Sequence, residues 1–214
     1  SELIGFAQYA KGKPCSTHYR KSEDGTKTLY TAEYTSDGKC IKPSLEFDES
    51  GAKLREFSLE HGKLEGAYVE WYPNTQVKNQ FQYKNGEFHG EQKSFYPTGE
   101  LAVQVNYVDG KRHGQQQEWY DNGQKWLVFT YVNGQKDGTC TKWHKNGKKQ
   151  YEATFKQGEL HGNEVYWLES GKMAFSQGFK EGKPHGRISQ WHDNGVCILE
   201  QDFHEGVLHG YHQE

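Results

Sequence analysis

The sequence predicts an all-β protein: an elongated, solenoid-like array of 24-residue β-hairpin repeats in a single twisted antiparallel sheet. Three observations predict this fold, namely a fixed period of 24 residues, two turn signals in each period, and alternating apolar side chains between them. No helical periodicity competes between residues 42 and 210. Because single hairpins are not stable alone, we expect the units to bury a shared aromatic stripe by stacking.

The period is visible in four sets of positions, which we interpret as the structural positions of the repeat. The first set is Gly66, Gly90, Gly114, Gly138, Gly162, Gly186 and Gly210. The second is Phe47, Trp71, Phe95, Trp119, Trp143, Trp167 and Trp191. The third is Tyr83, Tyr107, Tyr131, Phe155, Phe179 and Phe203. The fourth is His89, His113, His161, His185 and His209, with Asp137 in the missing place.

Each unit is expected to hold two short strands. One unit begins with the linker KRHG (111–114) and continues with a first strand, QQQEWY (115–120). A second strand, QKWLVFTY (124–131), lies between turns at Asn122-Gly123 and Asn133-Gly134, and Asn-Gly supplies the positive φ of tight hairpin turns. The alternation places Leu127, Phe129 and Tyr131 on the core face and Trp126, Val128 and Thr130 on the other face.

The period also sets the domain boundaries. Residues 1–22 match no repeat and are expected to form an N-terminal cap or an irregular segment. Residues 23–41 form a degenerate repeat, residues 42–210 form seven repeats, and residues 211–214 form the C-terminal end.

The composition favours a folded protein with a thin, aromatic core. Of the 214 residues, 33% are hydrophobic and 14% are aromatic, and a disordered chain would be poor in aromatics. The net charge of -3 offers no basic surface for nucleic acid, and no apolar run is long enough to cross a membrane, so membrane contact is not supported. Both a cytoplasmic and an exported location are compatible with the sequence, because a secretory signal could precede Ser1. In an oxidising compartment, Cys15 and Cys40 could form a disulfide.

The pattern W-Y-x-N-G … Y-x-N-G-K-x-H-G resembles the MORN repeat, in the variant form common in bacteria, over residues 25–210. The chain is similar to the YwqK-like antitoxins, which are arrays of this variant. The resemblance implies a protein-binding module that neutralises a toxin. The sequence departs from the eukaryotic MORN form, which opens each unit with Tyr-x-Gly, so the membrane roles of eukaryotic MORN proteins are not carried over.

The histidine positions invite a metal-site interpretation, which the expected geometry opposes. Histidines one period apart should lie ~10 Å apart, two strand spacings. A zinc ion needs every ligand within ~2.0–2.2 Å, so adjacent histidines of this set cannot share one ion. We expect no metal ligands, and imidazoles that hydrogen-bond backbone at the linker. The chain also contains no recognisable catalytic or cofactor motif, so we expect neither a catalytic residue nor a cofactor, and no enzyme.

Apolar residues that break the polar face are candidates for partner contact. We expect this face, opposite the core, to carry Tyr68, Trp126, Val128, Tyr166, Ile188 and Ile198. These residues could instead be buried by the twist of the sheet or by a cap. If the alternation is displaced by one residue, the assignment of side chains to the two faces is inverted. The predicted function is a non-enzymatic protein-binding module, with another protein, such as a toxin, or a second copy as the partner. The alternatives are an envelope-associated or self-assembling scaffold and a carbohydrate or cell-wall binder that uses the aromatic hairpins.

Overall fold

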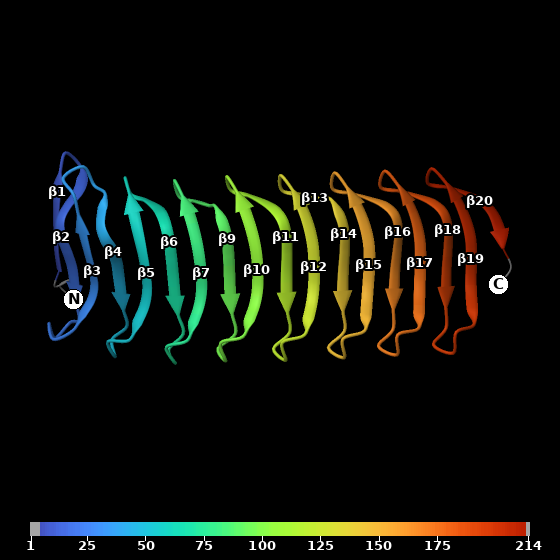
Figure 1. Cartoon of the computed structure of the whole chain (residues 1–214), viewed down its shortest axis with the longest axis horizontal. Coiled ribbons are helices and arrows are strands. Elements are labelled where there is room, and N and C mark those ends of the chain that lie inside the picture. The colour runs from blue at the N-terminus through green and yellow to red at the C-terminus, as the bar shows by residue number, and fades with distance from the viewer. Residues whose placement is uncertain (1–4, 213–214) are drawn as a thin grey trace. The chain divides into compact units, whose positions relative to one another are not determined.

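The computed structural model describes residues 5–212, except for the side chains of Ala10, Cys15, Tyr211 and His212. Its 20 strands belong to one open antiparallel sheet, and this part of the chain contains no helix (Figure 1). The predicted all-β fold of hairpin repeats in a single sheet is therefore confirmed. No helix in the described residues is long and apolar enough to span a membrane.

The chain divides into two compact units, Ser1–Leu101 with Tyr107–Gly110, and Ala102–Asn106 with Lys111–Glu214. The strands before the second unit are β1 (Gly5–Ala10), β2 (Lys13–Lys21), β3 (Thr28–Tyr34), β4 (Cys40–Phe47), β5 (Lys53–Glu60), β6 (Lys63–Trp71), β7 (Val77–Lys84), β8 (Glu87–Phe88) and β9 (Gly90–Phe95). Strand β10 (Leu101–Val108) contributes residues to both units. The second unit continues with β11 (Lys111–Trp119), β12 (Lys125–Val132), β13 (Gln135–Lys136), β14 (Gly138–Trp143), β15 (Lys149–Lys156), β16 (Glu159–Trp167), β17 (Met173–Lys180), β18 (Lys183–Trp191), β19 (Cys197–His204) and β20 (Val207–His212).

The pairing register defines the two faces of the sheet. In the hairpin of β11 and β12, Gln116 pairs with Phe129 and Glu118 pairs with Leu127, and paired residues share a face. We call the side that carries Leu127, Phe129 and Tyr131 the aromatic face and the other side the opposite face. The same register recurs in the hairpin of β16 and β17, where Tyr166 pairs with Phe175.

The two turns of each repeat differ in geometry, although the sequence suggested similar Asn-Gly turns. At Asn133-Gly134 both residues have positive φ, 50° and 85°, as a two-residue hairpin loop of type I′ requires. At the other turn only Gly123 has positive φ, 78°, and its amide donates to the carbonyl of Tyr120 at 3.0 Å. The Asn122 side chain accepts from the amide of Gln124 at 3.0 Å, so Asn122 closes this turn by its side chain.

A β-bulge precedes the tryptophan of each hairpin. The register shifts between Glu118 and Trp119, where the partner changes from Leu127 to Lys125 and leaves Trp126 unpaired. Equivalent shifts precede Trp71, Trp143, Trp167 and Trp191. The added residue changes which side chains share a face. A face assignment that is counted from the tryptophan across the bulge is therefore unreliable.

The segments expected as linkers are strand. Strand β11 begins at Lys111 and includes His113-Gly114, and the predicted linker 111–114 is therefore wrong. The His-Gly glycine, with φ of 79° at Gly114, lies inside the strand as a local irregularity and does not end it. Strands β1 and β2, expected as a cap or an irregular segment, form a hairpin that pairs with β3.

The buried core is small, as a single sheet without a covering layer requires. In the second unit a buried cluster consists of Leu127, Cys140, Tyr151 and Ala153, with Trp126, Phe129, Phe155 and Leu160 packed against it, and Tyr131 is also buried. In the first unit Ala32 and Tyr34 are the buried apolar residues of the described part. Most aromatic rings are therefore only half-buried.

Candidate functional site

Aromatic rings run along the aromatic face of the first unit. Tyr68 stacks between Phe57 and Phe81, with ring centroids 6.2 and 5.9 Å away. Phe88 continues the row between Tyr83, at 4.9 Å, and Tyr107, at 5.2 Å. These separations are those of favourable aromatic pairs, so the rings hold one another in place on an open surface.

The aromatic face of the second unit ends in a tyrosine pair around one carboxylate. The rings of Tyr151 and Tyr166 meet edge to face at 4.8 Å, and Tyr166 also contacts Phe175 at 5.8 Å. Both hydroxyls donate to one oxygen of Glu164, at 2.9 Å from Tyr151 and 3.2 Å from Tyr166. Burial, followed by the hydrogen bond to Glu164, raises the pKa of Tyr151 above its ordinary value. Tyr166 is 40% exposed, so this cluster presents a fixed aromatic ring to solvent.

Cations from the chain cover several of these rings. Lys136 lies 4.4 Å from the ring centre of Phe129 and 5.0 Å from that of Phe155. Arg112 lies 5.4 Å from the ring centre of Tyr131, and Lys142 lies 5.4 Å from that of Tyr151. The repeat period does not predict these contacts, although Arg112 and Lys136 occupy the repeat positions that hold Phe88 and Leu160 elsewhere. Each contact is attractive, because the face of an aromatic ring is electronegative.

The predicted placement of Tyr68, Tyr166 and Ile188 on the opposite face is wrong. Tyr68 pairs with Phe81, Tyr166 with Phe175, and Ile188 with Gln177, and all of these belong to the aromatic face. The physical reason is the bulge beside each tryptophan. Its extra residue lies on the second strand (Trp126 in β12, Ala174 in β17) and inverts a face assignment that is carried from one strand of the hairpin to the other. Tyr166 is exposed, whereas Tyr68 and Ile188 are half-buried.

The other three candidates are half-buried. Val128 pairs with Gln117 and Thr141 and lies on the opposite face, as predicted. Ile198 is the extra residue of the bulge in β19. It lies between Leu199, which pairs with Gln190, and Cys197, which pairs with Trp191. Trp126 packs against the buried cluster of the second unit and lies 6.4 Å from Tyr120, so the expectation of an exposed anchor there is wrong. Because the bulge leaves the Trp126 backbone unpaired, its indole can pack against the buried cluster.

The tryptophans of the repeat are half-buried on the opposite face. Trp119, for example, directly follows Glu118, the last residue of its strand on the aromatic face. A lysine lies over two of these tryptophans: Lys53 is 4.8 Å from the ring centre of Trp71, and Lys149 is 5.7 Å from that of Trp167.

A column of equivalent positions recurs in successive repeats, and we call it the acceptor column because four of its members accept a hydrogen bond from the amide of a later turn. It comprises Glu65, His89, His113, Asp137, His161, His185 and His209. The carboxylate of Glu65 accepts from the amide of Asn85 at 2.7 Å, and Asp137 accepts from the amide of Gln157 at 3.1 Å. Nδ1 of His89 accepts from Asp109 at 3.4 Å, and Nδ1 of His185 from Glu205 at 3.5 Å. Each donor lies 20 residues after its acceptor and has positive φ, so the column fixes the turn of the next hairpin.

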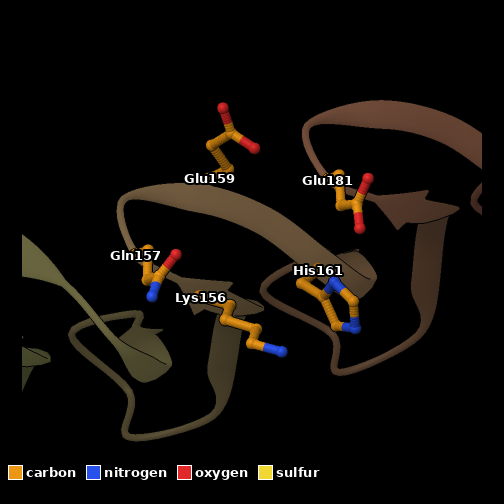
Figure 2. A pocket seen from close by; sticks show the side chains of 5 residues that line it. All are labelled: Lys156, Gln157, Glu159, His161 and Glu181. Carbon is orange, nitrogen blue, oxygen red and sulfur yellow. The ribbon is translucent and has the colours of Figure 1, made fainter.

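A polar cavity of about 350 Å³ lies beside one member of this column (Figure 2). Its walls are Lys156 and Gln157 at one turn, Glu159 and His161 on the following strand, and Glu181 at the next turn. Nδ1 of His161 is buried and has no hydrogen-bond partner in the described part. Within residues 5–212, no three His, Cys, Asp or Glu side chains stand in an arrangement that holds a metal ion.

The three cysteines whose side chains are described are free thiols. The expected disulfide of Cys40 involves Cys15, whose side chain lies outside the described part. The Sγ of Cys40 accepts from the amide of Leu59 at 3.2 Å. Cys140 is fully buried, and burial raises its pKa to about 12. Such a thiol packs as a small apolar side chain and is not a nucleophile at neutral pH.

Four stretches of the chain match the MORN repeat variant: residues 64–85, 88–109, 112–133 and 136–157. These four stretches, all within residues 64–157, are therefore similar to the MORN repeat variant. No curated protein matches the chain.

Proposed function

We propose that the protein is a non-enzymatic protein-binding module, and that the aromatic face is its contact surface. The observation that carries the proposal is the exposed ring of Tyr166, held by Tyr151, Phe175 and Glu164 on a sheet face that no second layer covers in the described residues. Rigid, partly exposed aromatics are typical anchors of protein interfaces, because they supply contact area at little cost in conformational entropy.

The shape of this surface favours a macromolecule over a small substrate. The rings and their covering cations are spread along successive strands, from Phe129 to Phe175 in the second unit. A small ligand would need an enclosed pocket with convergent polar groups. A partner that lies along the strands would contact several rings at once and would displace Lys136 or Lys142 from them. An acidic partner would fit those lysines, and a basic one would fit Glu164.

Neutralisation of a toxin is the specific form of this function that the repeat type suggests. In that case the chain would act by occlusion, covering the active surface of another protein rather than modifying it. The support is the MORN-variant match together with the open aromatic face. A self-assembling scaffold and a carbohydrate binder remain the competing functions.

The proposal is tested by affinity capture from the native lysate, followed by direct titration with the recovered protein. The test variant is Tyr166→Gln, because the next repeat has Gln190 at that position and the fold accepts it. The matched control is Val132→Lys, an exposed apolar residue of the opposite face whose equivalent in the next repeat is Lys156.

We expect one stoichiometric partner, bound at least about tenfold more weakly by Tyr166→Gln and equally by Val132→Lys. Recovery of the protein alone would favour the scaffold. Saturable quenching of tryptophan fluorescence by an oligosaccharide, without a protein partner, would favour the carbohydrate binder.

A further inference from the structure

We propose that Asn133 is a modification site, where the side-chain amide cyclises onto the main-chain nitrogen of Gly134 and is converted to aspartate or isoaspartate. Asn-Gly pairs are open to this reaction because glycine has no Cβ to obstruct the closing ring. The described residues contain five such pairs: Asn85-Gly86, Asn122-Gly123, Asn133-Gly134, Asn146-Gly147 and Asn194-Gly195. All five asparagines are exposed, so the contacts of each side chain decide which one reacts first.

The reaction needs only water. The Gly134 nitrogen loses its proton to hydroxide and attacks Cγ of Asn133, and the bond from Cγ to Nδ2 breaks. Nδ2 takes up a proton and leaves as ammonia, and a five-membered succinimide ring remains. Water then adds to one of the two ring carbonyls and opens the ring, which gives aspartate or, where the main chain passes through Cγ, isoaspartate. The net change is amide plus water to carboxylic acid plus ammonia, without any change of oxidation state.

The attacking nitrogen is held alike at all five pairs. Each glycine amide donates to a backbone carbonyl at 2.8–3.0 Å, and that of Gly134 donates to Arg112 at 2.8 Å. This hydrogen bond must open before the nitrogen can attack, and such openings are local fluctuations of exposed turns. Because the same bond exists at every pair, it lowers all five rates and does not rank them.

Three of the asparagine side chains are tied to the backbone. The Oδ1 atoms of Asn122 and Asn146 each accept from the amide two residues later at 3.0 Å, and that of Asn194 does so at 2.9 Å. Nδ2 of Asn122 also donates to the carbonyl of Lys145 at 3.4 Å. The corresponding bond from Asn146 to Glu169 measures 2.9 Å. Cγ cannot turn towards the following nitrogen until these bonds break, so they slow the reaction.

The side chains of Asn85 and Asn133 make no hydrogen bond to any described residue. Both occupy the first position of a two-residue loop, with φ of 52° and 50°, where the turn closes without help from the side chain. Their main-chain amides differ. The amide of Asn85 donates to the Glu65 carboxylate at 2.7 Å. The column residue equivalent to Glu65 is here His113, and the amide of Asn133 has no hydrogen bond in the described part, so Asn133 is the least restrained of the five.

Isoaspartate at this position would alter the hairpin that contains it. The main chain of isoaspartate is longer by one atom, and the loop between β12 and β13 has two residues, with Val132 paired to Gln135 across it. The length of such a loop fixes the register of the strands that it joins. Because β13 is itself two residues long, we expect it to lose its pairing with β12 in the modified chain.

The test follows all five pairs in the same chain. The full chain is kept folded at mildly alkaline pH, samples are digested under acidic conditions, and mass spectrometry with electron-transfer fragmentation measures aspartate and isoaspartate at each asparagine. A parallel incubation in urea gives the rate of each pair without structure, and each folded rate is divided by its unfolded rate. This ratio removes the effect of the preceding residue, such as Val132 before Asn133. The matched variant is His113→Glu, which supplies the carboxylate that Glu65 provides to Asn85.

We expect the ratio at Asn133 to exceed those at Asn122 and Asn146 at least about threefold, the effect of one further hydrogen bond that must break. His113→Glu should lower the ratio at Asn133 to that of Asn85 and leave Asn146 unchanged. Far-ultraviolet circular dichroism checks that the variant keeps its sheet. Equal ratios at Asn133, Asn122 and Asn146 would overturn the proposal, and an unchanged ratio in His113→Glu would overturn the rank of Asn133 above Asn85.

Discussion

The hydroxyl of Tyr151 donates a 2.9 Å hydrogen bond to the carboxylate of Glu164, from a position that is 8% exposed. Burial, and then this hydrogen bond, raises the pKa of Tyr151 above the ordinary value of 10.0. A pKa raised by folding stabilises the folded chain below the unfolded pKa, and this contribution is lost as the pH rises above it. We expect the free energy of unfolding to fall above about pH 10.

Tyr151→Phe isolates this contribution, because it removes the ionisable hydroxyl and keeps the ring. Urea unfolding between pH 8 and pH 11 should show a shallower alkaline loss for Tyr151→Phe than for the wild type. An equal alkaline slope in both proteins would show that Tyr151 does not cause the loss. The pKa of Tyr34 is also raised, first by burial, so part of the slope should persist in the variant.

The acceptor column predicts a stability difference between two substitutions at one position. Asp137→Ala leaves the amide of Gln157 without the carboxylate that it contacts at 3.1 Å, and should lower the free energy of unfolding by about 0.5–1.5 kcal/mol. Asp137→His supplies the imidazole that accepts the equivalent bond at His89 and His185 and should recover most of that loss. Chemical denaturation measures both variants, and a histidine no better than alanine would contradict a hydrogen-bonding role for the column.

Thr75 is a strained residue that glycine should relieve. It occupies the place held by Gly51, Gly99 and Gly123 in neighbouring repeats, and it has φ of 67°, a left-handed conformation that β-branched residues avoid. Relief of this strain is partly offset by the conformational entropy that glycine adds to the unfolded chain. We expect Thr75→Gly to raise the free energy of unfolding by about 0.5–1 kcal/mol. Thermal unfolding tests this, and Gly123→Thr, the reverse change in another repeat, should lower stability.

The thiols should differ in reactivity. Cys197 is exposed, whereas Cys140 has no exposed surface and a pKa of about 12. At neutral pH, iodoacetamide should modify Cys197 in the folded protein and reach Cys140 only when β14 separates from its neighbours. Mass spectrometry of labelled peptides with and without denaturant measures this. Equal labelling rates in the folded state would indicate that the second unit opens locally.

The sequence was sufficient for the repeat and for the faces of the second strands, because Leu127, Phe129 and Tyr131 alternate without interruption. It was insufficient for the first strands. Their faces follow from the pairing across the bulge beside Trp167, where the extra residue, Ala174, lies on the second strand and inverts an assignment carried from one strand to the other. The contact of Glu164 with Tyr151 joins residues 13 apart on neighbouring strands, and the acceptor column joins residues 20 apart. Such contacts follow from strand register and side-chain rotamers, which periodicity does not specify.

The acceptor column has a consequence for how such a protein changes in length. Every bond in it joins a residue to an amide 20 positions later, and the acceptors recur every 24 residues. If a DNA segment encoding 24 residues is duplicated or lost, each remaining acceptor still meets an amide of the correct kind. Recombination between neighbouring copies can therefore lengthen or shorten the array one whole hairpin pair at a time. An insertion of any other size within the 20 residues that a bond spans would separate an acceptor from its amide, so selection would preserve the spacing within each span.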